Sequence, residues 1–69
     1  METLHNSVIA KLVREWMDEP GNTAELMAAK LGCSKQAVLN KVNGDVDFWF
    51  LEAVKAAELI GCEVSDFVE

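Results

Sequence analysis

The residues with the clearest chemistry in this chain are amides and lysines gathered in one short segment. From Ala29 to Gly44 there is no aspartate or glutamate, and the polar positions carry mainly lysine, glutamine and asparagine. Amide side chains can pair with the edge of adenine, and lysines attract the flanking phosphates, so this composition suits double-stranded DNA. The candidate DNA-binding residues are Ser34, Lys35, Gln36, Asn40, Lys41 and Asn43, with Thr23 and Lys30 as candidate phosphate contacts.

Residues 23–44 must position these side chains, and their pattern predicts two short helices joined by a tight turn. Gly32 is expected to end the first helix in the left-handed conformation that glycine adopts without strain. Ser34 can then cap the second helix with its hydroxyl. In that second helix Val38 and Val42 share one face, which leaves the polar residues elsewhere. A helical hairpin with a solvated polar face would give the same pattern.

A family resemblance extends from residue 23 to the end of the chain. The sequence resembles the helix-turn-helix domains of the lambda repressor and Cro group at Ala28, Gly32, Ser34, Val38, Gly44, Ala57, Ile60, Gly61, Val64 and Ser65. The segment SKQAVLNKVNG is more similar to the CII-type regulators of P2-like phages. The resemblance implies an all-α, compact bundle of about five short helices forming one domain, residues 1–69, with the motif at 23–44.

The chain departs from the family pattern at two positions. Where family members commonly carry a glutamine that braces a phosphate, this chain has Ala24. The repressor group also places an apolar residue three positions after the first one in the second helix. Here that position is Lys41, and Val42 follows it. The second departure agrees with the CII-type pattern.

Two further helices are expected to complete the domain. One runs from about residue 6 or 7 to 19, has a wide apolar face centred on Trp16, and ends at Pro20 and Gly21. The other runs from about 48 to 60 and ends at Gly61. Its inward face is expected to carry Trp49, Phe50, Ala53, Val54, Ala56, Ala57 and Ile60.

Phe48 and Leu51 fall outside that inward face, among charged residues. Large apolar groups on a charged face are usually covered by something. One alternative is that residues 64–68 fold back over them, with Phe67 as the cover. The other is that Phe48, Leu51 and Lys55 form a contact with a second copy of the chain or with a different partner.

The first hypothesis for function is a small phage- or prophage-type transcription regulator that binds operator DNA as a homodimer. Helix 35–43 would lie in the major groove. Gln36 and Asn40 would read base edges, and Lys35 and Lys41 would bind phosphates.

The charge balance supports a second hypothesis. The chain has 69 residues, with 12 acidic and 6 basic side chains and a formal net charge of −6, which is unusual for a nucleic-acid binder. Residues 30–44 carry three lysines and no acid, whereas the segments on both sides are acidic. An acidic adaptor or antirepressor could therefore keep the helix-turn-helix fold without binding DNA tightly and act on another regulatory protein. The feature that favours it is the acidic surface of helix 48–60 with Phe48 and Leu51.

Neither catalysis nor a metal or other cofactor is predicted. Cys33 and Cys62 do not belong to a Cys-x-x-Cys pair, and His5 is the single histidine. We expect two buried free thiols, with a disulfide as the alternative, and hence a reducing, cytoplasmic location. No paired carboxylates in a plausible cleft, activated nucleophile or phosphate-binding glycine loop indicates an enzyme. Neither a signal peptide nor a membrane span is expected.

Overall fold

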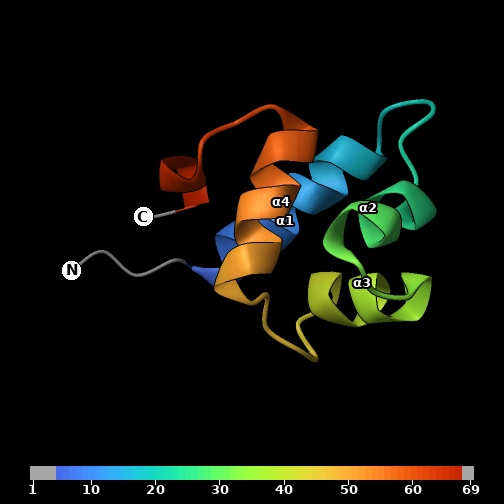
Figure 1. The fold of residues 1–69 in the computed structure, drawn as a ribbon, viewed down its shortest axis with the longest axis horizontal. Helices are drawn as coiled ribbons and strands as arrows, with labels where there is room; N and C mark the ends of the chain where they lie inside the picture. Colours follow the sequence, from blue (N-terminus) through green and yellow to red (C-terminus); the bar gives the residue numbers. More distant parts are fainter. Residues whose placement is uncertain (1–4, 68–69) are drawn as a thin grey trace.

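The structure, a computed structural model, describes residues 5–67, and every regular element in that range is a helix. The elements in chain order are α1 (Asn6–Met17), α2 (Ala24–Leu31), α3 (Lys35–Val42), α4 (Phe50–Ile60) and the short 3-10 helix η1 (Val64–Phe67) (Figure 1). The prediction of an all-α bundle of about five short helices is confirmed for this part of the chain.

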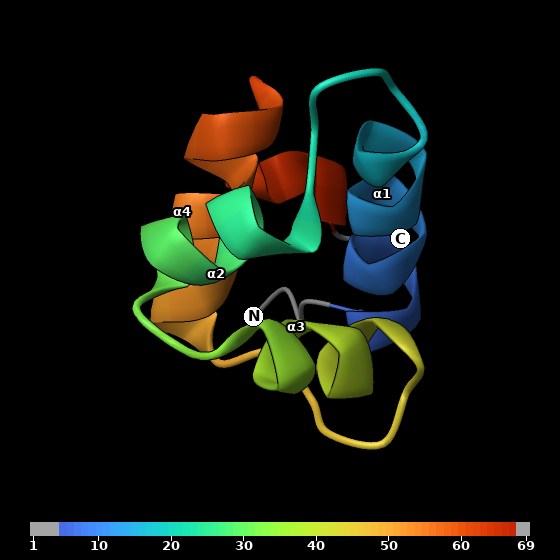
Figure 2. The ribbon, with the colours of Figure 1, turned by 90° about the vertical axis from the view of Figure 1, so that its right-hand side faces the viewer.

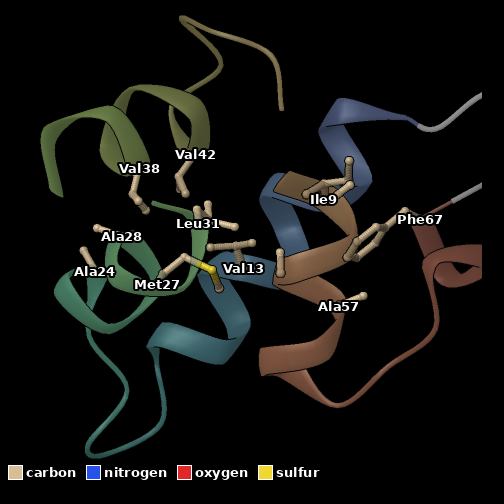
Figure 3. Close-up of a cluster of buried hydrophobic side chains, with 12 residues drawn as sticks. Ile9, Val13, Ala24, Met27, Ala28, Leu31, Val38, Val42, Ala57 and Phe67 are labelled. Carbon is tan, nitrogen blue, oxygen red and sulfur yellow. The ribbon is translucent and has the colours of Figure 1, made fainter. Parts of the chain in front are cut away.

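The helices surround one core. α2 and α3 contact each other, α1 contacts α3 and α4, and η1 contacts both α1 and α4. Figure 2 shows α3 running beneath α2 and beside the start of α1. The largest fully buried side chains are Ile9, Val13, Met27, Val38 and Phe67, which come from four of these elements and converge in Figure 3.

The turn between α2 and α3 forms as its sequence predicts. Gly32 has a φ of 78°, in the left-handed region, and its N–H donates to the Ala28 carbonyl at 2.8 Å. Ser34 Oγ accepts from the Ala37 N–H at 3.1 Å and caps α3. Thr23 Oγ1 does the same for α2 by accepting from the Leu26 N–H at 3.2 Å. Such hydroxyl caps each stabilise a helix by about 1 kcal/mol.

The predicted start and inward face of α4 were partly wrong. The helix begins at Phe50, and the side chains of Trp49 and Phe50 are 73% and 63% exposed. The later start of α4 follows from a contact with α1. The Phe48 N–H donates to Asn6 Oδ1 at 2.7 Å, and the Phe48 side chain packs against the core, so Phe48 precedes the helix. The inward positions of α4 are therefore taken by the small residues Ala53, Ala56 and Ala57.

Phe67 is a core residue and does not cover Leu51. Its side chain is fully buried, its carbonyl accepts from the His5 N–H at 3.0 Å, and η1 contacts α1 and α4. Leu51 remains 69% exposed. The expectation that Phe67 would cover it was wrong, and Val68, which was part of the same prediction, lies outside the residues described.

Both cysteines are free thiols, as the sequence predicts, and no disulfide joins them. They are half-buried rather than fully buried and pack against the core from the ends of α2 and α4. Burial raises the pKa of each thiol, and the negative charge of Glu52 adds to this effect at Cys33. The reactive thiolate is therefore less populated at neutral pH than in an exposed cysteine.

We expect Phe67→Ala to lower the free energy of unfolding by about 3–5 kcal/mol, because it removes a fully buried aromatic ring and leaves a cavity. Leu51→Ala is the matched control and should change it by less than about 0.5 kcal/mol, since that side chain is exposed. Urea denaturation followed by circular dichroism at micromolar protein measures both. Equal effects of the two substitutions would contradict the placement of Phe67.

Candidate nucleic-acid interface

One face of α3 packs into the core, and the other faces are accessible to solvent. Val38 and Val42 are 0% and 4% exposed and point into the core (Figure 3). The polar side chains around them remain accessible to different degrees. Ser34, Lys35, Gln36 and Asn43 are exposed and Asn40 is half-buried. Five of the six candidate DNA-binding residues thus remain accessible on or beside one rigidly seated helix.

A hydrogen bond between two amides organises the exposed side of α3. Gln36 Nε2 donates to Asn40 Oδ1 at 3.0 Å, one helical turn away. This bond uses one of the two Nε2 hydrogens and leaves the second hydrogen and Gln36 Oε1 available. Those two groups match the N7 acceptor and N6 donor of adenine in the major groove. Asn40 therefore orients Gln36 as well as presenting its own NH₂ group.

The hydroxyls of Thr23 and Ser34, at the starts of α2 and α3, are candidate hydrogen-bond donors to phosphate. Thr23 and Ser34 are exposed, and each oxygen already accepts a backbone N–H as a cap. A hydroxyl that accepts in this way still has its own hydrogen to donate. Ser34 can therefore donate to a phosphate oxygen without losing its cap, whereas Thr23 also hydrogen-bonds the Glu25 side chain and would have to exchange that bond for one to a phosphate.

α1 fixes the far end of α3. Arg14 Nη1 donates to the Val42 carbonyl at 3.0 Å, where the last carbonyls of α3 have no partner within the helix. A cation at this end also complements the partial negative charge of the helix terminus. This role of Arg14 could not be predicted from the sequence, because Arg14 belongs to the polar side of α1 and is 28 residues from Val42.

Lys41 does not contribute an exposed charge, and its assignment as a DNA contact needs correction. The residue is 6% exposed, and its Nζ lies 3.4 Å from Glu52 Oε1. The same carboxylate oxygen accepts from the Trp49 N–H at 2.8 Å and so holds the start of α4. The departure from the family pattern at this position was a usable signal, because an apolar residue three after Val38 would also face inward.

The other two lysines of the segment are exposed but paired. Lys35 Nζ lies 2.9 Å from Glu25 Oε1, and Lys30 Nζ lies 2.9 Å from Glu58 Oε2. The hydrogen bond from Lys35 lowers the pKa of Glu25, and the hydrogen bond from Lys30 lowers that of Glu58. Ion pairs between exposed side chains are weak because solvent screens them, so either lysine can exchange its carboxylate for a phosphate.

All three lysines of the positive segment thus face acids from other parts of the chain. Glu25, Glu52 and Glu58 come from α2 and α4, and sequence reasoning missed them as partners. Their spacing carries no local signal, because each pair joins different helices. The interface therefore presents amides and hydroxyls with little uncompensated positive charge.

Within residues 5–67 there is no cluster of three His, Cys, Asp or Glu residues that could hold a metal ion. No helix in that range is both long and apolar enough to cross a bilayer.

Comparison with known proteins shows a likeness of fold. No family model and no curated protein matches the chain. The solved structure of the cobalt(II) form of HppE with Tris buffer is similar, with a TM-score of 0.73 and 15% identity over 97% of this chain and 38% of that chain. Hydroxypropylphosphonic acid epoxidase from S. wedmorenis with fosfomycin gives a TM-score of 0.72 and 16% identity over 99% and 36%. This chain spans less than two-fifths of either protein, and at this identity the likeness concerns the fold alone.

We expect Glu52→Gln to destabilise the protein by about 3 kcal/mol, because it leaves the Lys41 ammonium buried without a counter-charge. Glutamine keeps an oxygen for the Trp49 N–H, so the loss is electrostatic. The double variant Lys41→Met with Glu52→Gln should recover most of the lost stability, since no buried charge remains. Urea titration of wild type, both single variants and the double variant gives the full cycle. A stability unchanged by Glu52→Gln would show that Lys41 is solvated.

Proposed function

We propose that this chain is a small DNA-binding transcription regulator of the phage or prophage type. α3 would enter the major groove of operator DNA. The observation that carries the proposal is the Gln36–Asn40 amide pair, which lies on a helix whose opposite side is fixed in the core. The resemblance of residues 23–44 to the lambda repressor and Cro group supports the same geometry.

The contacts divide into two kinds under this proposal. Gln36 reads an adenine through Oε1 and its second Nε2 hydrogen, with Asn40 holding its orientation and contacting the neighbouring base. Lys35 and Lys30 release their glutamates and bind phosphates, and the Thr23 and Ser34 hydroxyls donate to phosphate oxygens. Lys41 takes no part.

The expected affinity for DNA and its salt dependence follow from these contacts. Two lysines per chain correspond to a slope of log affinity against log salt of about −2 per copy. The formal net charge of −6 opposes long-range attraction to DNA. Binding should therefore be modest at physiological salt and depend more on base contacts than is usual for a basic domain. The two free thiols agree with action in the reducing cytoplasm.

One observation favours a second candidate, an acidic adaptor or antirepressor that works on another regulatory protein. The lysines at 30, 35 and 41 are all paired with glutamates, which leaves little uncompensated positive charge for a phosphate group. If these pairs hold, the fold serves as a protein-binding module.

A duplex-binding experiment separates the two candidates. An operator is first selected from a library of random duplexes, and fluorescence anisotropy then follows binding of operator and random duplex across a range of salt. We expect Asn40→Ala to lose about 1–3 kcal/mol of preference at one position of the operator. Lys35→Ala should weaken both duplexes alike and reduce the salt slope by about one unit.

Glu25→Gln gives the opposite result, because it removes the acid that competes for Lys35. We expect it to strengthen binding to every duplex by roughly fivefold at low salt, which is about the energy of an exposed ion pair. Glu15→Gln, which removes an exposed acid of α1, is the matched charge control. If neither wild type nor Glu25→Gln binds any duplex at low salt, the adaptor candidate replaces the regulator.

A further inference from the structure

The start of α4 carries the largest group of exposed apolar side chains in the part of the chain that the structure describes. Trp49, Phe50 and Leu51 are 73%, 63% and 69% exposed, and Val46 in the preceding loop is 44% exposed. We call these four residues the α4 apolar surface. Figure 1 shows the loop that leads into α4 projecting from one edge of the molecule.

The backbone beneath this surface is fixed rather than frayed. The Trp49 N–H donates to Glu52 Oε1 at 2.8 Å, and the Phe48 N–H donates to Asn6 Oδ1 at 2.7 Å. Glu52 is in turn paired with the buried Lys41. The exposed rings are therefore presented from an ordered helix start, which lowers the entropy that a partner must overcome on binding.

Charged groups lie at both ends of the α4 apolar surface, with opposite signs. Asp45 and Asp47 precede it in the loop, and Lys55 follows Leu51 by one helical turn. All three are exposed, and no ion pair joins any of them to another residue in the range 5–67. Along the direction of α4 the order is therefore acid, apolar group, base.

When a second copy is placed antiparallel, the acidic end of one copy faces the basic end of the other. A two-fold axis through an interface brings residue i of one copy against residue j of the other, and the same contact recurs in reverse. Two α4 helices packed antiparallel would place Lys55 of each copy beside Asp45 and Asp47 of the other. The apolar side chains of both copies would meet between these two charge contacts.

The available area agrees with a weak dimer. The four side chains expose on the order of 500 Å² together, given that one aromatic side chain accounts for roughly 150–250 Å². Trp49, Phe50 and Leu51 are successive positions and project in different directions, so two copies would bury less than about 1,000 Å², which corresponds to a weak, transient interface. We propose that the α4 apolar surface binds a second copy of this chain, with the α4 helices antiparallel across a two-fold axis.

The sequence pattern predicts a partner contact at Phe48, Leu51 and Lys55. Leu51 and Lys55 are exposed and belong to this proposal, whereas Phe48 is half-buried against the core and does not. Trp49 and Phe50 take its place. The proposal does not depend on DNA binding, because it rests on this surface alone.

Sedimentation equilibrium over a wide range of protein concentration, without DNA, tests the proposal. The wild type should form dimers with a dissociation constant in the micromolar to millimolar range, as expected for an interface of this size. Leu51→Glu should weaken the dimer by at least about tenfold, because it places an unpaired charge among apolar groups. Circular dichroism should show the helical content unchanged in the variant.

A charge exchange tests the antiparallel arrangement. Lys55→Glu and the double variant Asp45→Lys with Asp47→Lys should each weaken self-association by roughly tenfold, since both create like-charge contacts. An equimolar mixture of these two variants should form heterodimers at least as well as wild type, because both contacts then become attractive. Lys11→Glu is the control for net charge and should leave the dimer intact.

A wild type that stays monomeric at millimolar concentration would overturn the proposal and assign the surface to a different partner. A dimer that survives Leu51→Glu, or variants that fail to associate when mixed, would overturn it as well. None of these results bears on the duplex titration, so the two proposals can fail separately.

Discussion

Val38 and Val42 fix α3 in the core, and the position of every candidate contact depends on this packing. Both side chains are almost fully buried, and Arg14 adds a hydrogen bond to the carbonyl of Val42. The Lys41–Glu52 pair ties the same helix to the start of α4. A chain of this size buries a modest core, so breaking any one of these contacts would remove a large share of the net stability. Their joint effect is to fix the backbone of the helix from which the Gln36–Asn40 pair projects.

The same contacts explain why the interface is poor in charge. Burial takes Lys41 out of solvent, and Glu25 and Glu58 compensate Lys35 and Lys30 at the surface. A buried pair costs desolvation energy and gives little net stability, but removing one partner is expensive. The exposed pairs are cheap to break. Lys30 and Lys35 can therefore change partner, whereas Lys41 is structural. Under the proposed function this limits attraction to phosphates and leaves base discrimination to Gln36 and Asn40.

The parts of the fold that depend on contacts between residues close together in the sequence were predictable. A left-handed glycine and a hydroxyl cap act within a few residues, so the turn at Gly32 and the cap at Ser34 could be read directly. The start of α4 could not, because it depends on a hydrogen bond between Asn6 and Phe48, which are 42 residues apart. The exposure of Lys35 and Gln36 on α3 followed from helical periodicity, whereas the burial of Lys41 was not predicted. The pairing of the lysines with Glu25, Glu52 and Glu58 was not predictable either, since it depends on how separate helices pack.

The most direct test of the central claim is a two-dimensional ¹H–¹⁵N NMR titration of the protein with a selected operator duplex at low salt. If α3 lies in the major groove, the side-chain NH₂ signals of Gln36 and Asn40 and the backbone signals of α3 should shift most. The signals of Trp49 and Leu51 at the start of α4 should move little. Shifts centred on Trp49 and Leu51 with α3 unchanged, or no shifts at all, would contradict the assignment of α3 as the DNA-reading helix.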